Sequence, residues 1–225
     1  MNIPAFKIAS FELVDIPLIE AVAKRGKPII LSTGMGTLAE IEEAIVVTRR
    51  AGNNQIVLLR CVSAYPADPS DANLRTMPNL AETFGVPVGL SDHTLGHEVA
   101  LTAVALGACL IEKHLTLARD EGGPDAAFSL EPHEFKAMVD AIRVVEKAMG
   151  SVRYGSSIME TENRAFRRSL FVVKDVRKDE KVTDQNVRSI RPGGGLHTRH
   201  LKEILGRRFK KDVCKGTPLT RDLIS

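Results

Sequence analysis

The chain has 225 residues and a formal net charge of +3, which is too small to indicate a polyanionic partner. Hydrophobic residues make up 44% of it and charged residues 26%, the balance of an ordinary globular protein with one or two domains. Its three cysteines form no CxxC pair, so the sequence indicates neither a zinc knuckle nor a disulfide framework. No apolar run reaches the roughly 18 residues of a membrane helix, and no secretion signal opens the chain; we expect a cytoplasmic protein without a membrane partner.

In residues 1–155, short apolar runs alternate with helical segments. Each run is apolar nearly throughout, which is typical of strands buried on both faces of a parallel sheet. In chain order the predicted strands are Phe6–Ser10, Pro28–Thr33, Ile56–Ser63, Val86–Ser91 and Cys109–His114. Helix signals follow them, among them a capping box of Thr37 with Glu40 and a long helix from Pro132 to Met149. The pattern predicts five successive strand–helix units.

The length of these units distinguishes two parallel-sheet folds. Five units in about 150 residues give about 30 residues per unit, the spacing of a TIM barrel, whose eight units take about 250 residues. A Rossmann sheet would need a glycine-rich G-x-G-x-x-G turn, and none follows a predicted strand. The sequence therefore predicts an α/β fold with part of a TIM barrel in residues 1–155.

Polar side chains gather at the carboxyl end of every predicted strand, where barrel enzymes build their active sites. Residues two apart share one face of a strand, so Ser91 lies with His93, and Glu112 with His114. If these two strands are neighbours, two imidazoles and a carboxylate converge, and neutral imidazoles are good ligands for a divalent metal. The residues alone leave another interpretation open, because a histidine in a barrel is often a hydrogen-bonded structural residue.

Six segments occur in the order seen in the sialic acid synthase family: KIASFE, PIILSTGM, LLRCVSAYP, VGLSDHTLG, ALGACLIEKHLTL and GGPDAAFSLEPHEF. The chain resembles this family over essentially its whole length, and resembles the pseudaminic acid synthase branch most closely. The resemblance implies a transferase that joins phosphoenolpyruvate to an amino-sugar aldehyde, with a divalent metal, and releases phosphate. It also implies a TIM (β/α)8 barrel, here its last five units, followed by a small SAF domain similar to type III antifreeze protein.

Residues 164–225 have a different pattern, with short strands, glycine and proline turns and one-turn helices. They match the SAF domain of the family, a compact β-clip. The segment is rich in basic residues, which leaves a nucleic-acid-binding module as an alternative. It has no row of aromatic side chains that could stack on bases and no recognised nucleic-acid motif, so we expect no nucleic-acid partner.

The resemblance assigns roles to individual residues. His93 and His114 match the metal ligands, with Mn²⁺ or Mg²⁺ expected, and Glu112 matches the catalytic carboxylate that handles protons or orients water. The positions that match substrate-binding residues are Lys7, Ser10, Ser32, Ser63, Ser91, Asp125 and Arg191, with Tyr65 beside them. For a single serine, capping a turn is an alternative role, and Lys7 or Arg191 could be solvated surface cations. In the family the arginine reaches a neighbouring subunit's pocket, which implies a domain-crossed homodimer.

Two positions separate the branches of the family. Sialic acid synthases typically carry asparagine where this chain has Ser63, and KIGSGE where it has KIASFE. These differences favour a pseudaminic acid synthase that acts on 2,4-diacetamido-2,4,6-trideoxy-L-altrose. An N-acetylneuraminate or legionaminate synthase is the alternative, and an inactive truncated chain with a structural role is a third.

An eight-stranded barrel needs three more units before Phe6, and only five residues precede it. The resemblance therefore predicts a chain without the first part of its barrel. An open five-stranded sheet has two unpaired edges and an exposed inward face, which favour aggregation. We expect unpaired edges at Phe6–Ser10 and Cys109–His114, and no activity of the chain alone.

Overall fold

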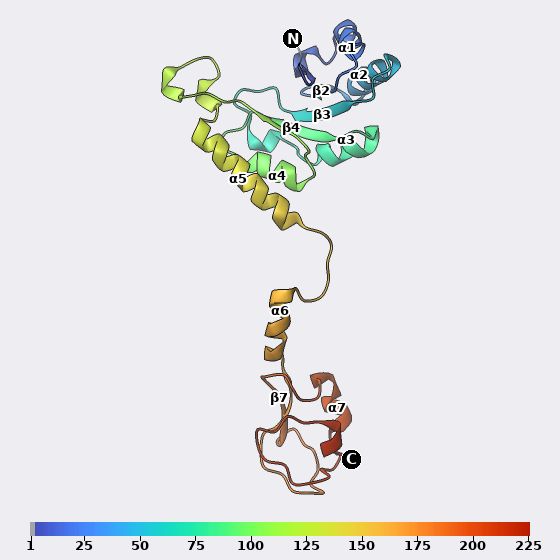
Figure 1. Cartoon of the computed structure of the whole chain (residues 1–225), viewed down its shortest axis with the longest axis vertical. Coiled ribbons are helices and arrows are strands. Elements are labelled where there is room, and N and C mark those ends of the chain that lie inside the picture. The colour runs from blue at the N-terminus through green and yellow to red at the C-terminus, as the bar shows by residue number, and fades with distance from the viewer. Residues whose placement is uncertain (1–2) are drawn as a thin grey trace. The chain divides into compact units, whose positions relative to one another are not determined.

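The computed structural model describes residues 3–225. The chain divides into two compact units, Met1–Ser151 and Val152–Ser225 (Figure 1). The first unit alternates strands with helices, as the sequence predicts. Its elements are β1 (Phe6–Ile8), α1 (Ile16–Ala23), β2 (Ile29–Ser32), α2 (Leu38–Arg50), β3 (Ile56–Cys61), α3 (Thr76–Phe84), β4 (Val88–Asp92), α4 (Glu98–Ala105), β5 (Ile111–Lys113) and α5 (Pro132–Met149).

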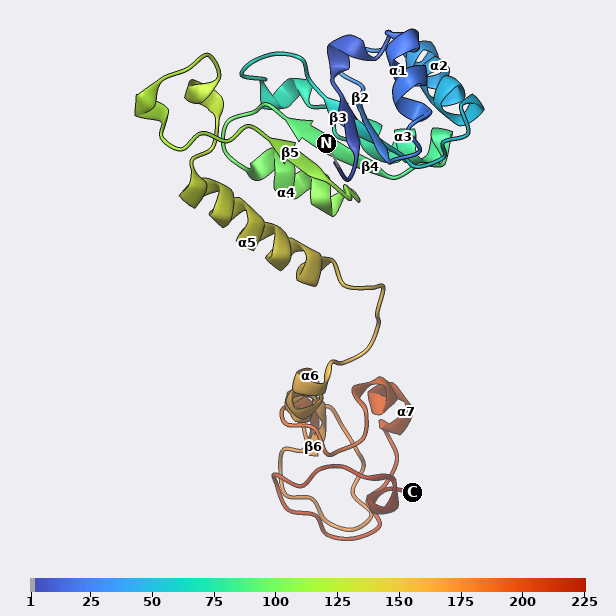
Figure 2. The same cartoon turned by 45° about the horizontal axis from the view of Figure 1, so that its top comes forward.

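The five strands are all parallel and lie in the order β1-β2-β3-β4-β5 (Figure 2). This confirms the prediction of five successive units and of a partial TIM barrel. β1 and β5 form the two edges, and in the part of the chain that the structure describes no strand pairing joins them to each other. The predicted edges at Phe6–Ser10 and Cys109–His114 are therefore confirmed, and the sheet is an open half-barrel.

Alternate residues of the strands form a core with the helices. Leu31, Leu58 and Leu90, from β2, β3 and β4, are buried and belong to one hydrophobic cluster with Ile45 of α2 and Met77 of α3. Successive side chains of a strand point to opposite faces. The intervening positions of the same strands therefore face away from the helices, and this second face is where the polar residues predicted for the site lie.

The paired strands are shorter than the apolar runs predict. β1 ends at Ile8, and Ser10 already begins a short 3-10 turn (Ser10–Glu12). β4 starts at Val88 rather than Val86 and continues to Asp92. Burial extends beyond the last paired residue, since Ser10 and His93 are both buried. An apolar run in the sequence indicates that residues are buried, not that they pair with another strand. The predicted strands therefore extend over buried loop residues such as Ser10.

Local signals set the helix starts. Thr37 and Glu40 form the predicted capping box: Thr37 N donates to Glu40 Oε2 at 2.7 Å, and Glu40 N donates to Thr37 Oγ1 at 3.3 Å. The helix predicted from Pro132 to Met149 has those bounds. Among residues 3–225, no helix combines the length and the apolar character that crossing a membrane requires.

The second unit contains α6 (Ile158–Asn163), β6 (Ser169–Val172), β7 (Val187–Ile190) and α7 (Leu201–Ile204). β6 and β7 pair in antiparallel fashion, and isolated bridges add to this pairing. Leu170, Phe209 and Leu219 are completely buried in a hydrophobic core separate from that of the first unit. Short strands and one-turn helices are the pattern that the turn-rich sequence predicts.

Candidate active site

Glu112 lies at the centre of the polar residues on the free face of the sheet. It is opposite Ser91 in the register of β4 and β5, and Ser91 Oγ donates a hydrogen bond of 2.6 Å to Glu112 Oε1. The same oxygen lies 3.6 Å from Nζ of Lys7, which comes from β1 at the other edge of the sheet. A carboxylate, a hydroxyl and a cation that the sequence predicts for one site are therefore in contact.

His93 follows β4, and His114 follows β5; their ring centroids are 5.2 Å apart. Nδ1 of His93 lies 2.8 Å from the carbonyl oxygen of Val62. A carbonyl can only accept, so Nδ1 carries the hydrogen and Nε2 keeps its lone pair. Burial lowers the pKa of His93 below its usual 6.5, and the bond to Val62 opposes this to a smaller extent. His93 is therefore neutral at pH 7, the form in which imidazole binds a metal.

Two aromatic rings and a carboxylate surround the histidine pair. The ring of Tyr65 lies 4.4 Å from that of His93, and the ring of Phe128 lies 5.1 Å from that of His114. Asp125 Oδ2 is 3.6 Å from His114 Nδ1. Burial raises the pKa of Tyr65, so its phenol stays protonated and can donate a hydrogen bond at neutral pH. Tyr65 and Asp125, both predicted to touch substrate, therefore lie beside the predicted metal ligands.

The histidine pair fits part of a metal site. In residues 3–225, no cluster of three or more histidine, cysteine or acidic side chains is arranged to hold an ion. His93 and His114 can supply two nitrogen ligands, and the fixed N–H of His93 is the arrangement common in metal-binding histidines. The remaining ligands of a divalent ion would come from water or substrate, which leaves the open positions that catalysis needs.

Ser10 and Ser63 form a second polar group, with their Oγ atoms 2.8 Å apart. Gly34 lies against them with φ of +40°, and a Cβ there would overlap Ser10 Cβ and lie 2.6 Å from Ser63 Oγ. Oγ of Ser32 is buried and has no hydrogen-bond partner among residues 3–225. Buried polar atoms are normally paired, so this hydroxyl has an unused hydrogen-bonding capacity next to the predicted site. The predicted serines thus offer short donors of the kind that bind anions.

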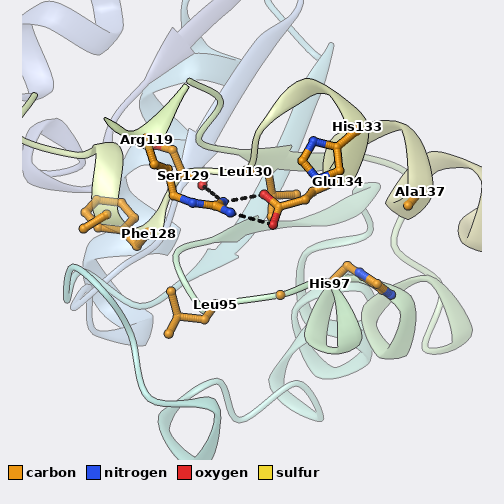
Figure 3. A pocket seen from close by; sticks show the side chains of 11 residues that line it. Leu95, His97, Arg119, Phe128, Ser129, Leu130, His133, Glu134 and Ala137 are labelled. Carbon is orange, nitrogen blue, oxygen red and sulfur yellow. Dashed lines mark hydrogen bonds and ion pairs between the residues drawn. The ribbon is translucent and has the colours of Figure 1, made fainter. Parts of the chain in front are cut away.

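Arg119 anchors the loop that carries Asp125. Its Nη2 donates to Glu134 Oε1 at 2.8 Å and its Nη1 to Ser129 O at 3.1 Å, while its backbone N donates to Glu131 Oε1 at 2.9 Å. Figure 3 shows Arg119 reaching Glu134 across one wall of a cavity of about 420 Å³. The guanidinium lowers the pKa of Glu134 to about 2. Through Arg119, these bonds hold the beginning of the loop, and Ser129 near its end, beside the first residues of α5.

Arg191 follows β7 in the second unit, where its side chain is exposed. All the other residues predicted for the site belong to the first unit. The role of Arg191 stays a prediction.

Sequence reasoning did not single out Asp92 and Lys113, whose charged groups lie 2.7 Å apart. A signal for them was present, because two opposite charges occupy otherwise apolar strands and alternate with the predicted site residues. Phe128 was missed as well, and it had no such signal, since it lies in a loop whose course the strand pattern does not predict.

Two family models match the chain. The NeuB family matches residues 1–154, and the SAF domain matches residues 167–225. A pseudaminic acid synthase of Helicobacter pylori is 47% identical over 224 residues, 99% of this chain and 66% of that protein. An N,N'-diacetyllegionaminic acid synthase of Campylobacter jejuni is 42% identical over 92% of this chain and 63% of that protein. The chain thus spans about two thirds of the length of these relatives.

A solved structure shares the fold. The N-acetylneuraminic acid synthetase of Leptospira borgpetersenii, crystallised in complex with citrate, superposes with a TM-score of 0.67 at 37% identity. The match covers 72% of this chain and 56% of that one.

Proposed function

Because the chain belongs to the NeuB family, we propose that it carries the active site of a synthase that condenses phosphoenolpyruvate with an amino sugar. The substrate we propose is 2,4-diacetamido-2,4,6-trideoxy-L-altrose, so that the products are pseudaminic acid and phosphate. The observation that carries this proposal is the convergence of the Ser91–Glu112–Lys7 group with the His93–His114 pair on one face of the sheet. The relative from Helicobacter pylori, a pseudaminic acid synthase, supports the choice of sugar.

Phosphoenolpyruvate carries a phosphate and a carboxylate, and both need cations and short donors. Lys7 supplies the cation, and Ser10, Ser32 and Ser63 supply hydroxyls, of which that of Ser32 has no partner among residues 3–225. Gly34 leaves the space that a side chain would fill. These residues bind the anion and orient its methylene carbon toward the sugar.

His93 and His114 would hold the divalent metal, with Mn²⁺ or Mg²⁺ as the ions we propose. When bound, the ion supplies Lewis-acid polarisation of the aldehyde oxygen. The chain's own part is to present the imidazole of His93 in neutral form, which burial favours, and to fix the orientation of its ring through the bond from Nδ1 to Val62 O.

Glu112 is the residue we assign to proton transfer. The methylene carbon of phosphoenolpyruvate bonds to the aldehyde carbon as the carbonyl double bond of the aldehyde opens, and the aldehyde oxygen becomes a hydroxyl with one proton of the water, passed on by Glu112. The water oxygen adds to the neighbouring carbon, the bond from this carbon to the phosphate oxygen breaks, and a ketone forms as the second proton leaves with the phosphate. Glu112 accepts the proton of the water, while Ser91 and Lys7 fix the orientation of its carboxylate.

Asp125 and Tyr65 are the residues we assign to the sugar, together with Arg191 from the second unit of a partner subunit. This assignment makes the enzyme a domain-crossed homodimer, with a synthase domain in residues 1–155 and a SAF domain in residues 164–225. The proposed place of this chemistry is the cytoplasm, where phosphoenolpyruvate is available.

A legionaminate or N-acetylneuraminate synthase is the second candidate. The Campylobacter jejuni legionaminic acid relative favours it, because at 42% identity it is almost as similar to this chain as the pseudaminic acid synthase. The two candidates share every residue role given above and differ in the sugar.

Phosphate release tests the proposal. The 225-residue chain is assayed alone and fused to three further βα units taken from the Helicobacter pylori relative, with the altrose-derived and the mannose-derived sugars side by side. We expect release by the fusion with the altrose-derived sugar, and loss of it in Glu112→Gln. If the fusion has equal kcat/KM for both sugars, the assigned substrate is wrong. If the fusion releases no phosphate with either sugar, the proposed reaction is wrong.

A further inference from the structure

Lys113 and Asp92 form a buried ion pair directly behind the proposed site. Lys113 Nζ lies 2.7 Å from Asp92 Oδ2, and each side chain is only 1% exposed. The two residues are register partners at the ends of β4 and β5. Charged residues are almost never fully buried unless they are paired, so the fold holds both groups here at a cost in desolvation.

Thr94 completes the cluster. Asp92 Oδ1 accepts hydrogen bonds from Thr94 N at 3.0 Å and Thr94 Oγ1 at 2.7 Å, and Lys113 Nζ donates to Thr94 O at 2.6 Å. Asp92 and Thr94, which flank His93, are thus bonded to each other and to Lys113, which lies between Glu112 and His114.

The cluster and the site occupy opposite faces of the same strand ends. Ser91 pairs with Glu112 on the site face, and the next register pair, Asp92 with Lys113, points the other way. Movement of Asp92 or Lys113 would therefore displace the backbone that carries both imidazoles. Stability alone does not require this arrangement, because apolar residues of similar volume often replace a buried ion pair without loss of stability.

We propose that Asp92, Lys113 and Thr94 are positioning residues that set the separation of the His93 and His114 rings and thereby the affinity of this pair for a divalent metal. The inference rests on the proposed metal role of the two histidines. The three residues act through the backbone next to each histidine, because the Asp92–Lys113 pair lies on the face of the strands opposite Ser91 and Glu112.

Calorimetric titration of the 225-residue chain with Mn²⁺ tests this inference. The Asp92→Leu/Lys113→Met double variant removes both charges at once, and it should lower the melting temperature only modestly, because the bonds that Thr94 N and Oγ1 make to Asp92 are lost with the ion pair. We expect its Mn²⁺ affinity to fall about tenfold, the lower end of the loss seen when groups supporting metal ligands are removed.

A matched pair of threonine variants separates positioning from general stability. Thr94→Val removes the hydroxyl bond to Asp92, and Thr48→Val removes a hydroxyl bond of 2.8 Å from Thr48 Oγ1 to Ala44 O in the buried face of α2. Both should lower the melting temperature slightly, and only Thr94→Val should weaken Mn²⁺ binding. If the double variant does not fold, the comparison of Thr94→Val with Thr48→Val tests the inference by itself.

The outcomes distinguish this inference from the proposed function. If the parent binds Mn²⁺, His93→Ala does not, and the folded Asp92 and Thr94 variants bind as tightly as the parent, the positioning role is wrong and the metal site stands. If the parent shows no Mn²⁺ binding, or His93→Ala binds equally well, the metal site is wrong and the positioning role is overturned with it.

Discussion

Lys7 and Glu112 lie on the two edge strands of the sheet, yet Nζ of one is 3.6 Å from Oε1 of the other. The sheet therefore curves until its edges meet through side chains, although no strand pairing joins β1 and β5 in residues 3–225. Both side chains are partly exposed, so this ion pair contributes at most about 1 kcal/mol to stability. Because it lies on the polar face of the sheet, the role that we propose for it is in substrate binding rather than in folding.

Lys7→Met should weaken phosphoenolpyruvate binding by about tenfold to a hundredfold, because a hydrogen bond to a charged group contributes about 1.5–3 kcal/mol. The melting temperature should change little. Calorimetry with phosphoenolpyruvate measures the first effect. Lys24→Met is the control, since it removes an exposed ion pair with Glu20, also on the first unit, that has no part in the site. Equal affinity in Lys7→Met and the parent would show that Lys7 is a solvated surface cation.

His93→Ala and His114→Ala should each abolish Mn²⁺ binding while the chain stays folded. Loss of one of two nitrogen ligands leaves too few protein donors to hold the ion. His133→Ala is the matched control, because its imidazole is exposed and lies 3.7 Å from Glu131, away from the histidine pair. Circular dichroism checks the fold, and calorimetry checks the binding. An unchanged titration in both site variants would rule out the assignment of the ligands.

Gly34→Ala should destabilise the chain more than Gly52→Ala. Both glycines have positive φ, of +40° and +87°, so each substitution costs about 1–2 kcal/mol of backbone strain. A Cβ at Gly52 meets nothing within 4 Å, whereas one at Gly34 overlaps Ser10 and crowds Ser63. Overpacking adds about 1–3 kcal/mol, and only Gly34→Ala should also weaken phosphoenolpyruvate binding. Denaturant unfolding of the two variants gives the comparison; equal losses would mean that the serines move aside freely.

Glu134→Gln should reveal a pH-dependent contribution to stability. The pairing with Arg119 lowers the pKa of Glu134 in the folded chain to about 2, below its usual 4.5. A depressed carboxyl pKa stabilises the fold above pH 4.5 and loses this effect as the pH falls toward 2. The parent should therefore exceed Glu134→Gln in urea midpoint at pH 6, and the difference should shrink below pH 4.5. A difference that stays constant down to pH 3 would contradict the pairing.

Arg191→Ala should raise the KM for the sugar more than the KM for phosphoenolpyruvate, because a remote contact mainly supplies ground-state affinity. In a domain-crossed dimer, a mixture of Arg191→Ala and His93→Ala subunits keeps one site with both groups. In the fusion protein, at sugar concentrations well below the raised KM, such a mixture should be more active than either variant alone. Absence of recovery after verified subunit exchange would exclude a site shared between subunits.

The pattern of apolar strands in the sequence was sufficient to predict most of the fold and part of the site. Period-two alternation in parallel strands predicts which side chains share a face, and this was sufficient to bring His93, His114, Glu112 and Ser91 together. It does not predict how strongly the sheet curves, so the contact between Lys7 and Glu112 was not foreseen. The same alternation places Asp92 and Lys113 on the opposite face, away from the predicted site, which is why their pairing was overlooked.

The contact of Ser63 with Ser10 and Gly34 bears on attempts to change the sugar preference of the proposed synthase. Asparagine, the residue typical of sialic acid synthases at position 63, is larger than serine and would enter space already bounded by Ser10. Residues that touch one another are energetically coupled, so the effects of substitutions at these positions will not add. A library that varies positions 10 and 63 together should therefore reach altered specificities that stepwise mutagenesis of either position would discard.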